Sequence, residues 1–222
     1  MISIVVICHN YGTFLPRCLE SLMKNKQRYL KEIIIINDSS SDNTKDIGEK
    51  YSRKYKKIKL YNKRFKSLSK STNFGIRKAK GEWVTKIDAD DYVSQNFLSG
   101  FIKETKKNFD FLWGNVIKVD ENTNKKEIIN QNFSKYNNFY KYPHGSGTVF
   151  KKKLWKTIGG FNENLFYQDD LDFWLKIKKN KNLSLKYLNV ANYYYRRHSK
   201  NMSKNLIKKN FTKIIVFLKN IL

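Results

Sequence analysis

Residues 82–92 read EWVTKIDADDY, an apolar run that ends abruptly in three acids. Its first half is rich in β-branched and aromatic residues, which indicates a buried strand. Asp88, Asp90 and Asp91 then follow within four positions. Carboxylates this close repel one another unless a positive group lies among them, and a Mn²⁺ or Mg²⁺ ion bound through oxygen would meet this need. The alternative is a solvated acidic turn ahead of a helix that begins near Gln95, because Asp-rich turns are common.

Two earlier segments share this plan of an apolar strand followed by a polar loop. Residues 3–8 and 31–37 are predicted strands, and a helix with Pro16 in its first turn follows the first of them. Strands that alternate with helices predict right-handed crossovers and a doubly wound α/β sheet. Because the ends of parallel strands meet at one edge of such a sheet, their loops form a common crevice. The crevice is expected to contain Asn10, Asp38, Asp88 and Asp90.

The rest of the chain is expected to continue as one compact domain followed by a tail. Further helices are predicted at residues 42–54, 69–80, 97–102, 152–158 and 171–179, and further strands at 57–61, 109–119, 183–188 and 191–197. The polar residues 120–132 are expected to form a turn or loop, and residues 205–222 an amphipathic helix. There is no internal repeat and no linker rich in Pro, Gly or Ser.

The composition is strongly basic, with 45 basic against 19 acidic residues and a formal net charge of +26. This favours a polyanionic partner, nucleic acid or an anionic membrane surface, although the abundance of Lys, Asn, Ile and Tyr also fits an A/T-rich coding sequence. No stretch reaches the ~20 apolar residues of a membrane-spanning helix, and the N-terminus has no signal-peptide pattern. Cys8 and Cys18 are expected to be buried, reduced thiols, which fits a cytoplasmic protein.

Four motifs in this order resemble the family 2 glycosyltransferases with the GT-A fold. They are VVICHNYGTFLPRCLESL, IIIINDSSSDNT, NFGIRKAKGEWVTKIDADD and GGFNENLFYQDDLDFWLKI, and the resemblance covers residues 1 to about 200. It implies a Rossmann-like, mostly parallel central sheet flanked by helices. It divides residues 1–203 into a nucleotide-binding half, 1–92, and an acceptor-binding half, 93–203, with 204–222 as a C-terminal helical tail. It also implies metal-dependent, inverting transfer of a sugar from a nucleotide-sugar donor to a glycan or lipid-linked acceptor, with Mn²⁺ or Mg²⁺.

The resemblance assigns the donor contacts residue by residue. Asn10 and Tyr11 match the first nucleotide-contact loop, and Asp38 matches the carboxylate that accepts a hydrogen bond from the base. A carboxylate can accept from the imide N–H of uracil, which cytosine lacks, so UDP is the favoured nucleotide. Asp88 and Asp90 match the DxD motif, in which Asp88 contacts the ribose and Asp90 the cation that bridges the diphosphate.

Two further residues are candidate ligands of the cation. Asp91 would contribute directly or through water. Arg196, Arg197 and His198 resemble a late basic element that closes over the diphosphate, and His198 is the candidate ligand within it. A lone histidine at such a position is more often a surface residue.

The acids at 169–172 match the Glu-Asp pair of the family, whose second member is the catalytic base. Asp170 is therefore the expected base, which an inverting transfer needs to take the proton of the acceptor hydroxyl. Asp169 belongs to the donor and acceptor pocket, which Gly147 and Gly160 would help to shape. The alternative is that Asp169, Asp170 and Asp172 cap a helix and favour its dipole.

Three departures from the family pattern bear on these assignments. Thr72 stands before Asn73 where an arginine near the diphosphate is frequent, and Lys70 or Arg77 would have to replace it. The usual Glu of the Glu-Asp pair is Asp169. The first loop has Cys8-His9 where small hydroxyl residues are common.

Two other functions remain open from the sequence. A nucleotidyltransferase shares the sheet and the acidic metal site, but it typically uses a phosphate loop rich in Gly and Lys, unlike HNYGTFLPR. A basic nucleic-acid-binding module would bind through its Lys and Arg surface, yet no nucleic-acid motif is present and no nucleic-acid partner is expected. For a glycosyltransferase, a homodimer and a peripheral contact at the inner face of the membrane stay open from the sequence. Residues 204–222 would either make the membrane contact or, as is more common for amphipathic helices, pack on the body of the protein or across a dimer interface.

Overall fold

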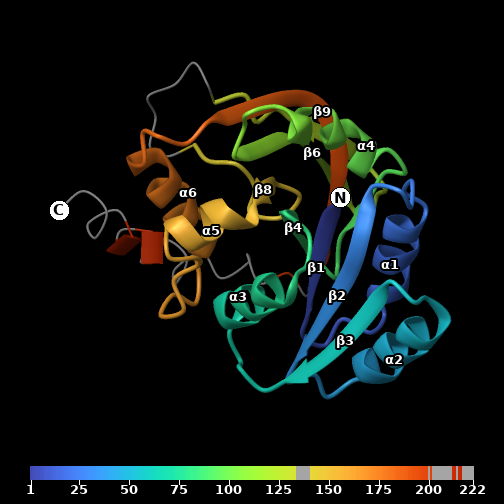
Figure 1. The fold of residues 1–222 in the computed structure, drawn as a ribbon. Helices are drawn as coiled ribbons and strands as arrows, with labels where there is room; N and C mark the ends of the chain where they lie inside the picture. Colours follow the sequence, from blue (N-terminus) through green and yellow to red (C-terminus); the bar gives the residue numbers. More distant parts are fainter. Residues whose placement is uncertain (134–140, 200, 202–211, 214, 217–222) are drawn as a thin grey trace.

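The structure is a computed structural model that describes residues 1–133, 141–199, 201, 212–213 and 215–216. Within these residues the chain builds one nine-stranded sheet with the order β3-β2-β1-β4-β8-β6-β9-β5, and β7 pairs with β6 (Figure 1). The strands are β1 (Ile2–Cys8), β2 (Leu30–Asp38), β3 (Ile58–Lys63), β4 (Trp83–Asp88), β5 (Tyr92–Val93), β6 (Phe111–Asp120), β7 (Lys126–Ile129), β8 (Val149–Lys151) and β9 (Leu185–Arg197).

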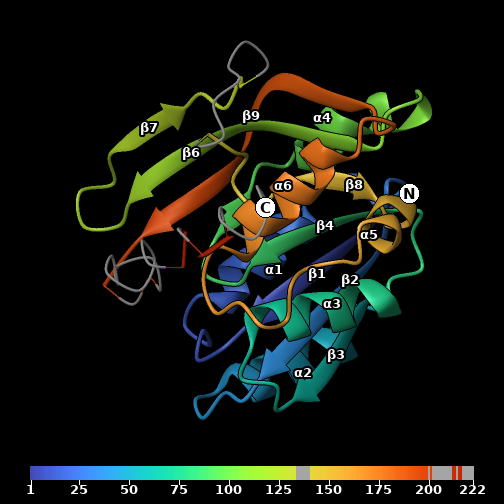
Figure 2. The ribbon, with the colours of Figure 1, turned by 90° about the vertical axis from the view of Figure 1, so that its left-hand side faces the viewer.

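Helices cover both faces of this sheet, as the alternation of strands and helices predicts (Figures 1 and 2). They are α1 (Leu15–Met23), α2 (Thr44–Lys54), α3 (Leu68–Lys78), α4 (Phe97–Ile102), α5 (Lys152–Thr157) and α6 (Asp169–Lys179), with a 3-10 turn, η1, at Glu104–Lys106. Alternate residues of β1 enter different cores, Ile4 the one beneath α1 and α4, and Val5 the one beneath α3, α5 and α6. Both faces of β1 are thus buried, which explains why its sequence is apolar throughout.

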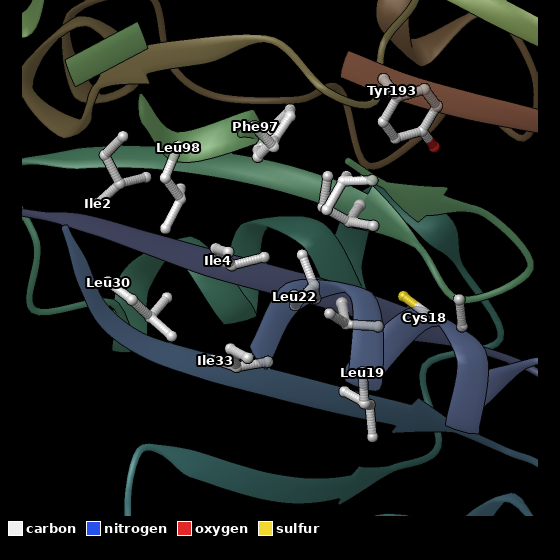
Figure 3. Packing of buried hydrophobic residues seen from close by; sticks show 14 of the residues in the cluster. Ile2, Ile4, Cys18, Leu19, Leu22, Leu30, Ile33, Phe97, Leu98 and Tyr193 are labelled. Carbon is white, nitrogen blue, oxygen red and sulfur yellow. The ribbon is translucent and has the colours of Figure 1, made fainter. Parts of the chain in front are cut away.

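The core beneath α1 and α4 fixes the first half of the molecule. Leu19 and Leu22 of α1 lie over Ile4 and Ile33 of the sheet, and none of the four side chains is exposed (Figure 3). Burying each side chain contributes roughly 1.5–3 kcal/mol. This packing holds α1, and with it the loop between β1 and α1, at the carboxyl end of the sheet.

The strand ends meet as predicted. Strands β3, β2, β1 and β4 are parallel, and their register places Asp88 beside Ile7 and Asn37 beside Cys8. The polar loops after β1, β2 and β4 therefore share one edge of the sheet. In the second half the sheet is mixed, because β8, β5 and β7 run antiparallel to their neighbours while β9 is parallel to β6. The mostly parallel α/β architecture is confirmed.

The structure corrects several element boundaries. Residues 120–132 are not only loop, because β7 pairs with β6 there; every residue of β7 is exposed, so burial leaves no pattern in its sequence. The two strand-like runs 183–188 and 191–197 form one strand, β9, whose register against β6 shifts near Asn115. Helix α3 ends at Lys78, two residues before the predicted end, and α6 begins at Asp169, two residues earlier than predicted.

The expected tail helix, residues 204–222, lies mostly outside the described residues. Of its described part, Val216 is buried and packs against Leu171 and Leu175 of α6. No helix among the described residues is long and apolar enough to cross a membrane. The boundary between the domain and the tail stays a prediction.

Candidate functional site

Asp88 ends β4 with its carboxylate between two partners. Lys86 Nζ lies 3.3 Å from Asp88 Oδ1, and the Ser146 hydroxyl donates to Asp88 Oδ2 at 2.6 Å. Burial opposes ionisation of this carboxyl, but the Lys86 ammonium and the Ser146 hydroxyl together hold its pKa below the ordinary value. Asp88 is therefore an anion at neutral pH. Lys86 was not predicted for the site, although a lysine inside an apolar strand is a visible signal.

Asp90 faces the C-terminal residues of the described chain. Its Oδ2 lies 3.1 Å from His198 Nε2 and 3.3 Å from the Asn201 amide nitrogen. The His198 ring stacks on Phe14 with centroids 4.4 Å apart, which fixes its orientation. Burial and the Asp90 carboxylate both raise the pKa of the Tyr11 hydroxyl beside this group. The structure thus brings together Tyr11, Asp90 and His198, three residues that the sequence predicted for the site.

A carboxylate facing an imidazole is a donor pair that suits Mn²⁺. Asp90 and His198 fit a cation with these two protein ligands, its remaining positions being left to water and substrate oxygens. The described residues contain no group of three or more His, Cys, Asp or Glu side chains placed to hold a metal. Any cation here would therefore depend on the bound donor for part of its coordination.

Asp91 has partners of its own. The Tyr193 hydroxyl donates to Asp91 Oδ2, and the Arg196 backbone N–H donates to Oδ1 at 2.8 Å. Burial, with Asp90 and Asp88 nearby, raises the pKa of Asp91 well above the ordinary value. These contacts fasten the loop after β4 to β9. To bind a cation as predicted, Asp91 would have to give up one of these donors.

The loop after β1 is joined to the loop after β2. Asn10 has a left-handed backbone with φ 57°, its N–H donates to Ser40 Oγ at 2.9 Å, and its Oδ1 accepts from the Ser41 N–H at 2.7 Å. Asp42 accepts from the N–H groups of Gly12 and Thr44, at 2.9 and 3.0 Å. Asp42 thus accepts hydrogen bonds just ahead of α2, which begins at Thr44, two residues after the predicted start.

Asp38 anchors the segment that leads into α3. Its carboxylate accepts from the backbone N–H groups of Phe65, Lys66 and Ser67 at 2.7–3.0 Å and from the hydroxyls of Ser39 and Ser71 at 2.9 Å. Burial alone would raise the pKa of Asp38, but the hydrogen bonds from these donors outweigh it and lower the pKa below its ordinary value. A carboxylate offers about four lone-pair sites, so five donors saturate it. Accepting from a nucleotide base, as predicted, requires Asp38 to exchange one of them.

The second acidic group lies at the start of α6. Asp169 is 6 % exposed, and its Oδ2 has no hydrogen-bond partner among the described residues. Burial raises the pKa of Asp169 to about 6; Lys86 lowers it, while Asp170 and Asp88 raise it. Asp170 Oδ1 accepts from the Leu171 N–H at 2.9 Å, and Asp172 pairs with Lys176 at 2.7 Å. A role at the start of the helix therefore accounts for these contacts of Asp170 and Asp172. It does not account for Asp169, whose Oδ2 has no hydrogen-bond partner among the described residues.

Residues 145–147 join the two acidic groups. A Cβ at Gly145 would lie 2.6 Å from the Cβ of Asp170, so only glycine lets the segment pass this close to α6. Gly147, with φ 82°, donates its N–H to the Lys86 carbonyl at 2.9 Å. The structure therefore places Gly147 at the predicted site, beside the end of β4.

Gly160 lies elsewhere, in a groove lined by Asn73, Arg77, Trp155 and Lys176. The Asn73 side chain donates to the Phe161 carbonyl and to Glu163, and accepts from the Trp155 indole and the Phe161 N–H, all at 2.8–3.0 Å. Asn73 thus clamps the 159–163 turn onto α3. Arg77, a suggested substitute near the diphosphate, lies on the same groove, 3.8 Å from Glu163.

Comparison with known proteins gives consistent matches. The family model described as Glycosyl transferase family 2 matches residues 3–164. The chain is 31 % identical over 123 residues to Glycosyltransferase GlyG of Streptococcus pneumoniae, covering 54 % of this chain and 40 % of that protein. It is 28 % identical to the GalNAc(5)-diNAcBac-PP-undecaprenol beta-1,3-glucosyltransferase of Campylobacter jejuni, covering 88 % of this chain and 64 % of that protein. This chain thus spans less than two thirds of either relative.

The fold matches solved structures as well. The structure of S. aureus TarS 1-349 in complex with UDP-GlcNAc superposes with a TM-score of 0.76 at 25 % identity, covering 91 % of this chain and 60 % of that one. The mannosyltransferase PcManGT of Pyrobaculum calidifontis, in complex with GDP-Man and Mn²⁺, superposes with a TM-score of 0.70 at 16 % identity, covering 96 % of this chain and 64 % of that one.

Proposed function

This chain belongs to glycosyl transferase family 2, and we propose that it transfers a sugar with inversion from a UDP-sugar to a hydroxyl of a glycan or lipid-linked acceptor. One observation carries the proposal: the segment 145–147 joins the two acidic clusters, because Ser146 donates to Asp88 at the end of β4 while Gly145 lies against Asp170 at the start of α6. A donor platform and a proton acceptor therefore belong to one centre, and perturbed ionisable groups of this kind gather at catalytic sites.

The donor side of the proposal rests on the loops after β1, β2 and β4. Asn10, Tyr11 and Asp38 would bind the nucleotide, and Asp88 would accept from the ribose hydroxyls. Asp90 and His198, 3.1 Å apart, would hold Mn²⁺ or Mg²⁺. When bound, the cation supplies Lewis-acid stabilisation of the leaving diphosphate. The likeness to TarS in its UDP-GlcNAc complex supports a UDP-linked donor.

The acceptor side rests on α6. Asp170 would take the proton from the attacking hydroxyl, a contribution of typically ~10²–10⁴-fold in rate. Asp169, whose pKa burial raises to about 6, retains a proton at higher pH than an ordinary aspartate. Two neighbouring carboxyls with different environments divide the acid and base roles, and the ionised one serves as the base. Gly147 would line the pocket between donor and acceptor, with Gly160 shaping the turn beyond it.

A lipid-linked acceptor would place the protein at the cytoplasmic face of a membrane. The undecaprenol carrier named for the relative from Campylobacter jejuni supports this choice. Lysines of the tail, residues 204–222, would make the peripheral contact with anionic headgroups while Val216 stays packed against Leu171 and Leu175 of α6. Co-sedimentation with anionic vesicles tests it, because binding should fall with salt and with removal of the tail. Chemical crosslinking in solution would test the proposed homodimer.

The decisive test of the function is a panel of nucleotide sugars assayed for transfer and hydrolysis with Mn²⁺, with and without EDTA. We expect one UDP-sugar to be turned over, EDTA to stop the reaction, and added Mn²⁺ to restore it. The matched control is the exposed Asp120→Asn variant, which should behave as the wild type. If no nucleotide sugar is consumed and UDP does not bind in the presence of Mn²⁺, the proposed function is wrong.

A further inference from the structure

Ser146 holds one oxygen of the Asp88 carboxylate. Its hydroxyl donates to Asp88 Oδ2 at 2.6 Å, which lies in the range of about 2.5–2.7 Å for a hydroxyl on an ionised oxygen. The other contact is looser, because Lys86 Nζ lies 3.3 Å from Oδ1, beyond the about 2.7–2.9 Å of a close ammonium–carboxylate bond. Of the two groups, the Ser146 hydroxyl therefore constrains the Asp88 side chain more tightly.

The chain after Ser146 is fixed against β4. The Gly147 N–H donates to the Lys86 carbonyl at 2.9 Å, and the antiparallel pairing of β8 with β4 follows, with Val149 beside Thr85. These bonds align residues 147–151 along β4. Ser146 is the next residue in the direction of the carboxyl end of β4, which is where Asp88 lies.

The chain before Ser146 is anchored by a buried glutamine. Gln131 is 6 % exposed, and its side-chain oxygen accepts from the His144 N–H at 3.1 Å. The backbone of Gln131 is itself bound to β6, where its N–H donates to Asn115 Oδ1 at 2.9 Å and its carbonyl accepts from the Trp113 indole at 2.8 Å. The ring atom His144 Nδ1 lies 3.3 Å from Ser146 N and 3.2 Å from Ser146 O. The Ser146 hydroxyl is therefore presented to Asp88 from a backbone held on both sides.

Asp88 keeps a side that is open to a ligand. Its side chain is 29 % exposed, whereas Ser146 is 2 % exposed. A carboxylate has about four lone-pair sites, and Ser146 and Lys86 use two of them. The remaining sites can accept from hydroxyl groups of a ligand. A serine that fixes the carboxylate before the ligand arrives reduces the entropy that binding would otherwise cost.

We propose that Ser146 is a positioning residue of the donor site, which holds the Asp88 carboxylate in the orientation that receives the ribose hydroxyls of the nucleotide. The inference rests on the proposed function, because it takes Asp88 as the ribose contact. The strength of such hydrogen bonds depends on their alignment. Without the Ser146 hydroxyl, Lys86 is the one group named above that still holds the carboxylate, and the alignment with the ribose is lost.

The test measures how well the protein distinguishes UDP from 2′-deoxy-UDP and 3′-deoxy-UDP, by calorimetric titration in the presence of Mn²⁺. We expect the wild type to bind at least one deoxy analogue about 10-fold or more weakly than UDP, because a hydrogen bond to a charged group contributes that much. In Ser146→Ala the ratio should fall to about 3-fold or less, because UDP loses affinity and the deoxy analogue does not. The KM for the UDP-sugar should rise about 3-fold or more while kcat stays within about twofold, as expected for a contact equal in ground and transition states.

Thr148→Val is the matched control. It removes another buried hydroxyl of the same segment, one that lies 3.5 Å from the Gly145 carbonyl, so the ratio should stay that of the wild type. Ser146→Cys keeps the size of the side chain but has only a weak donor, so its ratio should fall as in Ser146→Ala, and it replaces that variant if the alanine does not fold. A wild-type ratio in the Ser146 variants, or an equal loss in Thr148→Val, would overturn the inference.

The donor assignment of the proposed function fails separately. If Asp88→Asn keeps the wild-type ratio, Asp88 is not the ribose contact, and the donor assignment falls together with the role of Ser146. If Asp88→Asn loses the discrimination while Ser146→Ala keeps it, the donor assignment stands and only the role of Ser146 is overturned.

Discussion

The acids after β4 and the acids at the start of α6 are equally dense in the sequence but have different surroundings. Asp90 and Asp91 receive hydrogen bonds from His198, Asn201, Tyr193 and the backbone of Arg196. Asp169 is as deeply buried, yet its Oδ2 has no donor among the described residues. Both clusters hold a carboxyl of raised pKa, Asp91 and Asp169, so hydrogen bonding is what sets them apart. Carboxylates held by several donors make a rigid platform, whereas Asp169 keeps one buried oxygen that a ligand or a proton could satisfy.

The largest effect should come from the α6 cluster. Asp170→Asn keeps the size of the side chain but removes the base, so turnover should fall by ~10²–10⁴-fold while affinity for UDP and Mn²⁺ stays within about twofold. Steady-state kinetics with the accepted UDP-sugar and calorimetric titration of UDP measure the two quantities. Asp172→Asn, in the same helix turn, is the control and should retain far more activity. If Asp170→Asn keeps wild-type turnover, Asp170 is a helix cap and not the base, and the acids of α6 do not differ in catalytic role from those after β4.

The next effect concerns stability at the same cluster. The pKa of Asp169 rises from 3.8 to about 6 on folding, so the folded state holds a proton that the unfolded state loses first. The free energy of unfolding therefore falls as pH rises from about 4 to 6. Above pH 6 the loss of stability caused by the ionised, buried Asp169 has reached its full size. Asp169→Asn should raise the stability at pH 7 by up to about 3 kcal/mol.

Urea denaturation at pH 7 and pH 4 checks this expectation. The gain from Asp169→Asn should shrink to less than about 1 kcal/mol at pH 4, where the wild-type carboxyl is protonated in the folded state and only partly ionised in the unfolded state. Glu82→Gln, at an exposed position, serves as the control. An equal gain at both pH values would mean that the carboxylate of Asp169 is not the source of the cost.

The β4 cluster should respond in binding. In Asp90→Asn the fold should remain, because relief of repulsion offsets the lost contacts, but the affinity for UDP in the presence of Mn²⁺ should fall by about 10- to 100-fold. Calorimetric titration of UDP with Mn²⁺ and then with EDTA separates the metal-dependent part. Unchanged affinity would show that the platform binds no cation through Asp90.

The smallest effect tests the ion pair between Asp172 and Lys176 of α6. Lys176→Gln removes the partner of Asp172 and the donor to the Gly160 carbonyl, and should cost about 1 kcal/mol in the free energy of unfolding. Urea denaturation measures it, with the neighbouring Lys179→Gln as control. If turnover falls along with stability, Asp172 and Lys176 take part in the reaction as well.

The features of this fold that depend on the order of residues along the chain were predictable from the sequence. Apolar runs gave β1, β2 and β4, and their parallel order placed Asn10, Asp38 and Asp88 at one edge. The family resemblance identified His198 as a candidate cation ligand, and the structure places it 3.1 Å from Asp90. The partner of each side chain was not predictable, because it depends on orientation: Asp38 turns toward the N–H groups of residues 65–67, and Asp91 turns toward Tyr193, 102 positions away. Strand β7 was not predicted, because backbone hydrogen bonds hold it and its exposed side chains leave no burial pattern in the sequence.

The contacts between β9 and the loop after β4 also set the order in which the site can be completed. Tyr193, Arg196 and Asn201 reach Asp90 and Asp91 across 102 to 111 residues of chain. On a ribosome that adds ~5–20 residues per second, roughly 5–20 s separate the synthesis of the acids from that of their partners. During that interval the nascent chain carries its acids without these partners. The contacts that hold Asp90 and Asp91 can therefore form only after residues 193–201 have been synthesised.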